Sequence, residues 1–384
     1  MDTPLRLREL VAWLNALIAT LYPGCFAFVM ATGIISNAMI IEGHRGWSDA
    51  LFVVNLIAYP WLLLLTLVRI VRFWPNLQAD LTNPRLIFSF FTLVAGTAVF
   101  GLGMHLCGHE RTAAVLWIVA LILWLVLIYF SFGLLIFLKQ AQGVKVVHGA
   151  WLNAIVGTES LVLLGAAVAH AFGGLSPTIF VVSHWLWGIG LALYAIFITL
   201  LTYHLFFFDV EPDDITPLLW IVMGAAAIST NAGSVLIFAE SGMPFLDSMR
   251  PFIDGITLLM WAWGTWWIPL LLLLGFWKHG ICRVPLSYTP MLWSLVFPLG
   301  MYAIATSNLS LAADFPLLRS VSLVVVWVAL CVWAVTALGL AKTPWQNLSR
   351  NARAESHCNG DILWVHRGNH GHWKRLSLTE TLFQ

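Results

Sequence analysis

Two positions in long apolar runs carry residues whose chemistry is unusual there. These are the Phe297–Pro298 pair in WSLVFPLGMYAIAT and the carboxyl group of Glu159 in WLNAIVGTESLVLLGA. A proline inside a helix removes a backbone donor and crowds the carbonyl four residues back, which costs about 3 kcal/mol. The pair therefore predicts a broken or bent helix with an aromatic ring at the break. Two interpretations stay open: the ring has a role of its own at the break, or the pair is a packing kink with Phe297 buried between helices.

Glu159 raises a different question, because an ionised carboxylate near the middle of a membrane helix costs about 2.5–3.5 kcal/mol on insertion scales. A charged Glu159 would also repel an anion. We therefore expect this side chain to be protonated at neutral pH or to meet a partner such as a backbone donor. Two roles stay open for it, a proton relay and a structural hydrogen bond.

The composition predicts the class of protein that holds these residues. Of the 384 residues, 60% are hydrophobic and only 10% are charged, and the chain contains 21 Trp. The mean hydropathy is +0.87. A soluble domain of this size cannot bury so much apolar surface, so the chain is expected to be an all-α, polytopic membrane protein. The formal net charge of +1 gives no sign of a nucleic-acid partner.

Apolar runs of the length needed to cross a bilayer recur along the chain. Ten spans are predicted, at residues 22–42, 50–74, 86–106, 113–138, 149–172, 178–207, 215–239, 251–277, 289–312 and 317–341. Residues 1–21 are predicted to form an amphipathic segment at the cytoplasmic surface, and 342–384 a polar, non-periodic cytoplasmic tail. Fifteen of the 19 Lys and Arg residues fall on the side of the two termini, which places both termini in the cytoplasm by the positive-inside rule.

The odd-numbered spans recur with a period of about 65 residues, which suggests five parallel hairpins in a pseudo-fivefold ring around a central pore. Trp is concentrated in the even-numbered spans, where we interpret it as lipid-facing. The odd-numbered spans carry small or polar residues instead, and ordinary helix packing is the alternative explanation for them. The predicted pore-lining residues are Thr32, Gly33, Gly96, Gly157, Glu159, Gly224, Asn231 and Gly300.

Three stretches resemble a known family. PGCFAFVMATGIIS (23–36), WLNAIVGTESLVLLGA (151–166) and SLVFPLGMYAIAT (294–306) are similar to the first, fifth and ninth spans of the tellurite-resistance/dicarboxylate transporter family. That family includes the TehA proteins and the slow anion channels of plant guard cells. The resemblance implies five helical hairpins around a pore lined by the odd-numbered helices, assembly as a homotrimer, and occlusion of the pore by Phe297, with Pro298 at the bend.

The function expected from these features is transport of a small inorganic anion or organic acid across the cytoplasmic membrane, by a channel or facilitator gated by Phe297. The alternative is a proton-coupled carrier for a mono- or dicarboxylate of the malate type, or an exporter of tellurite or sulfite, with Glu159 as the relay. No nucleophile, P-loop or zincin motif points to an enzyme, and no cofactor is expected. The tail residues His357, Cys358, His366, His370 and His372 match no zinc template.

Overall fold

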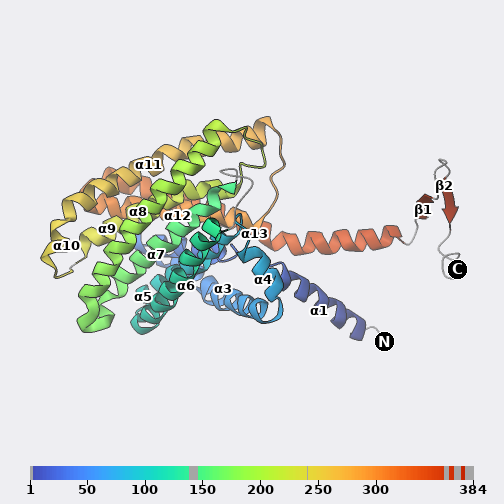
Figure 1. Ribbon diagram of the computed structural model, residues 1–384, viewed down its shortest axis with the longest axis horizontal. Helices are drawn as coiled ribbons and strands as arrows, with labels where there is room; N and C mark the ends of the chain where they lie inside the picture. The colour runs from blue at the N-terminus through green and yellow to red at the C-terminus, as the bar shows by residue number, and fades with distance from the viewer. Residues whose placement is uncertain (1–2, 138–145, 240, 359–362, 367–372, 377–384) are drawn as a thin grey trace. The chain divides into compact units, whose positions relative to one another are not determined.

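The computed structural model describes residues 3–137, 146–239, 241–358, 363–366 and 373–376 (Figure 1). It is dominated by long helices, and each predicted span coincides with one of them. These helices are α2 (Ala27–Ile41), α3 (Arg45–Arg72), α5 (Phe91–Leu106), α6 (Glu110–Phe137), α7 (Asn153–Val168), α8 (Ser176–Phe207), α9 (Ile221–Phe238), α11 (Arg250–Phe276), α12 (Trp293–Ala312) and α13 (Leu317–Cys358). The all-helical membrane class predicted from composition is confirmed.

Eight segments of the described chain are long and apolar enough to cross a membrane, and α2 is a shorter apolar helix. One of the eight, Gly149–Phe207, contains both α7 and α8. The two are joined by the 3-10 helix η4 (Ala169–Leu175), where Gly173 adopts φ 56° and ψ −122°. Glycine suits this position because side chains disfavour a positive φ, so the kink in the connection between α7 and α8 falls at this residue.

Burial separates the helices into two kinds. In their most apolar windows, 89% of Pro217–Phe238 and 83% of Ile87–Leu106 is buried inside the protein, against 17% of Arg45–Arg72. Helices α2, α5, α7, α9 and α12 are the buried ones, and we call them the inner helices. Each inner helix contacts two others, in the order α2, α5, α7, α9, α12 and back to α2. Their contacts therefore close a cycle.

The inner helices begin alike. Helices α5, α7, α9 and α12 each follow a 3-10 turn, namely η1 (Ile87–Phe90), η3 (Gly149–Leu152), η5 (Pro217–Trp220) and η7 (Pro290–Leu292), and α2 follows a turn at residues 23–26. Proline opens three of these turns, at Pro23, Pro217 and Pro290, where its fixed φ suits a helix start and its missing N–H is not needed. We call these five segments the entry turns.

The other long helices are α3, α6, α8, α11 and α13, and we call them the outer helices. They contact the inner helices through aromatic side chains. Each outer helix donates at least one hydrogen bond to the inner helix of the following hairpin. These bonds are Tyr59 Oη to Thr97 Oγ1 (3.1 Å), Trp124 Nε1 to Thr158 Oγ1 (2.7 Å), Trp187 Nε1 to the Ser229 carbonyl (3.1 Å), Trp261 Nε1 to Thr306 Oγ1 (3.0 Å) and Trp333 Nε1 to Thr32 Oγ1 (2.9 Å). Hydrogen bonds between membrane helices are typically worth about 0.6 kcal/mol each. The same kind of hydrogen bond between an outer helix and an inner helix thus recurs in every hairpin.

This recurrence corrects the interpretation of Trp as uniformly lipid-facing. Trp124 and Trp187 are 6% and 2% exposed, because their indole N–H groups find partners on inner helices. Trp61, Trp185 and Trp266 are more than half exposed and do lie on the outer surface. The Trp excess in the outer helices therefore has two sources, lipid contact and helix joining.

Two compact units divide the chain, residues 1–336 and 337–384. The first holds α1 (Thr3–Ala19), the inner helices and most of the outer helix surface. In the second, α13 continues to Cys358, and β1 (Leu363–His366) pairs antiparallel with β2 (Trp373–Leu376). The prediction of a wholly non-periodic tail is therefore wrong. His370 and His372 lie outside the described residues.

Candidate functional site

Residues in or just before the entry turns of all five inner helices line one cavity of about 280 Å³. Its lining includes Tyr22 before α2, Leu86 before α5, Gly149 of η3, Leu218 of η5 and Met291 of η7. We call this cavity the vestibule. Because an inner helix begins at each of its sides, the N-terminal ends of five helices converge on it. Helix N-termini carry partial positive charge and unpaired N–H groups, which favour anions.

Charged and polar side chains from four segments of the chain reach the vestibule. They are Arg85, His148, His204, Asp213 and Asp214. Arg85 brings the positive charge that an anion would meet here, whereas the two aspartates extend from the acidic loop at residues 209–214. The vestibule therefore holds charge of both signs at its rim.

His148 is held in its neutral form at this rim. Its Nε2 donates to the Arg85 carbonyl (2.8 Å), and its Nδ1 accepts from the Ala150 amide (3.2 Å). Only a neutral imidazole can donate at one nitrogen and accept at the other. Burial lowers the pKa of His148 to about 4, and the neighbouring Arg85 charge acts in the same direction. The ring therefore joins the entry turns of α5 and α7 without adding charge.

Helix α12 carries the Phe297–Pro298 pair, and the expected break is absent. The helix is continuous from Trp293 to Ala312 with Pro298 inside it. The proline ring packs against α9, where a Cβ added at Gly224 would lie 2.7 Å from Pro298 Cγ. Glycine at position 224 therefore makes room for the ring, so that α12 passes α9 without a break in its helical assignment.

The contacts of α12 show which direction Phe297 faces. Four outward or lateral contacts mark the helix surface: Pro298 with Gly224 of α9, Tyr302 Oη with Thr265 Oγ1 of α11 (2.8 Å), the Ala303 carbonyl with Ser322 Oγ of α13 (2.8 Å), and Gly300 with Ile34 and Ile35 of α2. Successive residues turn by about 100° around a helix. The four contacts together cover a little more than half of the circumference.

Phe297 lies in the remaining sector, together with Met301 and Asn308. These residues are four and eleven positions apart from Phe297, which places them on one face of the helix. Phe297 is only 1% exposed. Because α9 and α2 flank this sector and are themselves members of the cycle, the face carrying Phe297 is turned toward the inside of the cycle.

Asn231 also reaches this face. Asn308 Nδ2 donates to Asn231 Oδ1 (2.7 Å), and Asn231 Nδ2 lies 3.6 Å from Met301 Sδ. Asn308 further lines a cavity of about 390 Å³ with His170, near the C-terminal ends of α7, α9 and α12. The two amides thus connect α9 and α12 between Phe297 and the end of the cycle opposite the vestibule.

Glu159, one of the predicted pore-lining residues, lies at a contact between helices. Its carboxyl group packs against Gly190 of the outer helix α8, and its Oε1 lies 3.2 Å from Ser229 Oγ of α9. Oε2 has no hydrogen-bond partner among the described residues. The side chain is fully buried at the junction of α7, α8 and α9, because the rotation of α7 turns position 159 toward α8.

The other predicted lining residues also lie at helix contacts. Thr32 accepts the hydrogen bond from Trp333 described above. A Cβ added at any of the glycines would meet a neighbouring helix: Gly33 faces Asn55 and Val99, Gly96 faces Phe26, Gly157 faces Phe91, Gly224 faces Pro298, and Gly300 faces Ile34 and Ile35. Small residues allow this close approach. Their packing role is visible, and a role in lining a pore stays a prediction for them.

Sequence reasoning missed the vestibule, although a signal for it exists. Pro23, Pro217 and Pro290 stand at the start of three entry turns, and His148 stands at the corresponding place before η3. Aligning the five repeats on these residues would have brought the entry turns together. Arg85 would then have appeared as a basic residue near the mouth of the inner helices.

Comparison with known proteins agrees with this geometry. The sequence profile of voltage-dependent anion channels matches residues 20–341. An uncharacterized transporter of Methanocaldococcus jannaschii is 22% identical over 331 residues, covering 84% of this chain and 93% of the relative. An uncharacterized membrane protein of Mycobacterium tuberculosis is 37% identical over 169 residues, covering 44% of this chain and 84% of the relative.

The match spans every helix from α2 to the membrane part of α13, and therefore all five inner helices, the vestibule and Phe297. It also agrees with the resemblance seen in the three sequence stretches. The chain belongs to the voltage-dependent anion channel family, and membrane transport of anions is the function of its class.

Proposed function

We propose that the inner helices surround a path for small anions across the cytoplasmic membrane, entered through the vestibule and constricted at Phe297. The observation that carries the proposal is one cavity lined from the start of all five inner helices, whose mutual contacts form a closed cycle. The face of α12 that turns inward carries the Phe297 ring next to the path. A ring there offers no hydrogen bond to an anion, which suits a plug.

The electrostatics of this path favour conduction over tight binding. The five inner helices contain no Lys or Arg, so an anion inside the cycle meets no fixed cation. The attractive elements are the five helix N-termini and Arg85 at the vestibule, where Asp213 and Asp214 act against them, followed by the amides of Asn231 and Asn308 further along. A conducting path needs sites that are favourable enough to enter and weak enough to leave.

The placement of Glu159 supports a structural role over that of a proton relay. Ser229 Oγ lies 2.9 Å from the Ala225 carbonyl and 3.2 Å from Glu159 Oε1. A hydroxyl has one proton, so it cannot donate fully to both. We propose that Glu159 is protonated and donates to Ser229, while Ser229 donates to Ala225. The carboxyl group is then neutral and turned away from the anion.

The finer features of the expected topology belong to the same proposal. We propose that ten helices cross the bilayer as five hairpins with pseudo-fivefold symmetry, that both termini are cytoplasmic, and that three copies assemble. The charge asymmetry of the loops supports the orientation. In this proposed orientation the vestibule is the cytoplasmic mouth, because the inner helices start on the side of the termini.

The test is a flux and current survey of the purified full-length protein in liposomes, with chloride, nitrate, malate, sulfite and tellurite as substrates. We expect currents whose reversal potential follows the gradient of the permeant anion and does not shift with a pH gradient. A reversal potential that moves with the pH gradient would favour the proton-coupled carrier, and the absence of flux for every anion would contradict the proposal.

A further inference from the structure

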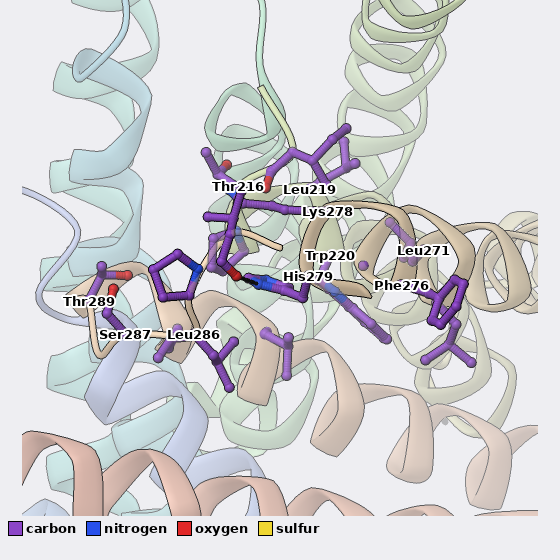
Figure 2. Close-up of a pocket in the computed structure, with 18 residues that line it drawn as sticks. Thr216, Leu219, Trp220, Leu271, Phe276, Lys278, His279, Leu286, Ser287 and Thr289 are labelled. Atoms are coloured by element: carbon purple, nitrogen blue, oxygen red, sulfur yellow. Dashed lines mark hydrogen bonds between the residues drawn. The ribbon is translucent and has the colours of Figure 1, made fainter. Parts of the chain in front are cut away.

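A second cavity, of about 410 Å³, lies beside the vestibule and outside the cycle of inner helices (Figure 2). Its walls come from the C-terminal end of α11, the π-helical turn η6 (Trp277–Ile281), the segment at residues 284–289 and the entry turn η5. The volume is within the range of small-molecule sites. The entry turn η7 adds Leu292 to the lining. Of all these walls, only the entry turns η5 and η7 also belong to the anion path described above.

One side of this cavity is polar and positively charged. Lys278 Nζ donates one hydrogen bond, to the Ile215 carbonyl (2.9 Å), whereas an ammonium group has three donors. His279 lies next to it, with its Nδ1 2.8 Å from the Val284 carbonyl. Ser287 and Thr289 add hydroxyl groups on the same side (Figure 2). Asp and Glu are absent from the lining in the part of the chain that the structure describes.

The other side is apolar and open outward. Leu271 and Phe276 stand opposite the polar groups (Figure 2). Leu272 and Phe276 are 58% and 67% exposed, on the outer surface of a helix that is long and apolar enough to span a membrane. This surface faces hydrocarbon in a bilayer, so the cavity opens sideways toward lipid and not into the protein.

We propose that this cavity binds one anionic phospholipid of the bilayer. The lipid phosphate lies near Lys278 and the hydroxyls of Ser287 and Thr289, and an acyl chain lies along Leu272 and Phe276. The argument is complementarity of charge and polarity: a basic, hydroxyl-lined end meets an apolar, outward-facing end where a membrane helix stops. Basic pockets between membrane helices on the cytoplasmic side are typical sites for anionic headgroups.

Neither half of the cavity would select this ligand alone. A free phosphate would use the polar side and leave the exposed leucine and phenylalanine side chains uncovered. A zwitterionic lipid would cover the apolar side but bring its own cation close to Lys278. The occupant therefore needs both an acyl chain and a net negative headgroup.

The site also contacts the helix that carries Phe297. Leu292 of η7 and Leu295 of α12 line the cavity, and Leu295 is two residues before Phe297 in the sequence. A bound lipid would thus pack on the start of α12. Through this contact a bound lipid can change the orientation of α12. The binding of the lipid itself does not depend on whether α12 constricts an anion path.

Glycine positions on α11 provide a matched pair of test variants. Gly275 lines the cavity, and a Cβ added there would meet nothing within 4 Å. Gly275→Phe should therefore project a ring at the cavity from a Cβ position that has no close neighbour. Gly255 is a second glycine of α11 with equally open surroundings, but it does not line the cavity. Gly255→Phe is the control for adding a ring to the surface of the same helix.

The experiment measures lipid retention by native mass spectrometry of the purified full-length protein in detergent, with phosphatidylglycerol and phosphatidylcholine in competition. We expect preferential retention of phosphatidylglycerol. Lys278→Gln should weaken it about fivefold, the amount expected from one basic residue near a headgroup, while Lys278→Arg should restore it. Gly275→Phe should abolish the preference, and Gly255→Phe and Arg72→Gln should keep it, since Arg72 is an exposed basic residue at the end of α3.

Three results would overturn the proposal. One is equal retention of the two lipids by the unmodified protein, and another is the same retention in Gly275→Phe and Gly255→Phe. The third is displacement of phosphatidylglycerol by millimolar inorganic phosphate alone, which would identify a free anion as the occupant. If Gly275→Phe fails to fold, the comparison of Lys278→Gln with Lys278→Arg decides, because both keep the apolar side intact.

Discussion

The position of Glu159 between α7, α8 and α9 leads to a sharp prediction about glycines in α8. A Cβ added at Gly190 would contact Glu159 Oε1 and lie 2.7 Å from its Cδ. Gly188, two residues earlier in the same helix, has nothing within 4 Å of the corresponding position. Alanine at these two sites therefore adds the same atom to the same helix, in a crowded place and in an open one.

The expected changes in the free energy of unfolding have opposite signs for the two variants. Gly188→Ala should stabilise α8 by up to about 1 kcal/mol, because alanine has a higher helix propensity than glycine. Gly190→Ala gains the same propensity but forces Glu159 to move, at a cost of about 1–3 kcal/mol for overpacking. It also disturbs the hydrogen bond with Ser229, worth about 0.5–1.5 kcal/mol. Because the gain in propensity cancels, the net difference between the two variants should be about 1.5–4.5 kcal/mol.

The assay is thermal unfolding of the two purified variants in one detergent, followed by intrinsic Trp fluorescence. We expect Gly190→Ala to melt well below the unmodified protein and Gly188→Ala to melt at or above it. The double variant Gly190→Ala/Glu159→Ala should recover most of the loss, because removing the carboxyl group removes the clash. Residues in contact show such coupling, whereas distant ones are additive.

Equal stability of the two alanine variants would refute the placement of Glu159 against α8. So would a double variant whose loss is the sum of the two single losses. Either result would indicate that the Glu159 side chain points elsewhere, and the proposed structural role would lose its basis.

Three further predictions address other parts of the account. Trp124→Phe, which removes the hydrogen bond to Thr158, should lower the free energy of unfolding by about 0.5–1.5 kcal/mol, whereas Trp185→Phe at a largely exposed site should change nothing measurable in the same melt. His148 is neutral in the folded protein, where its pKa is lowered from 6.5 to about 4. The melting temperature of the unmodified protein should therefore fall as the pH is lowered from 6.5 toward 4, and that of His148→Gln should fall less. An equal pH dependence of the melting temperature in the two proteins would contradict this. Glu159→Gln should conduct nearly normally in liposomes, and a folded but inactive variant would instead support a proton-coupled carrier.

The sequence alone predicted the helices well, because spanning a bilayer is a local property. A run of about 20 apolar residues is visible without knowledge of its neighbours, and the predicted spans differ from the helices by only a few residues at most ends. The distinction between inner and outer helices was also accessible. Small residues gather where helices approach closely, as at Gly224 opposite Pro298.

The rotation of each helix about its own axis could not be predicted from the sequence in the same way. Glu159 and Phe297 both occur in inner helices at similar depth, yet only Phe297 turns inward, since rotation depends on contacts with helices distant in the sequence. The double role of Trp has the same cause: Trp124 and Trp185 occur in similar apolar contexts, but only Trp124 finds an inner-helix partner. The vestibule combines residues from five separate segments, so no single segment predicts it.

The central claim is that Phe297 constricts an anion path inside the cycle of inner helices. Phe197 provides the matched control, because it is a buried phenylalanine of the outer helix α8 that packs on Phe88 and Trp151. Truncation at either site removes the same ring from a buried place, but only Phe297 lies on the inward face of α12.

The most direct measurement compares anion flux through liposomes holding equal amounts of folded protein with Phe297→Leu, Phe297→Ala or Phe197→Ala. The account predicts that flux rises in the order Phe297, Phe297→Leu, Phe297→Ala, as the side chain at the constriction becomes smaller. Phe197→Ala should lower stability and leave the flux per folded protein unchanged. Unchanged flux in Phe297→Ala, or an equal rise in Phe197→Ala, would contradict the claim that this ring closes the path.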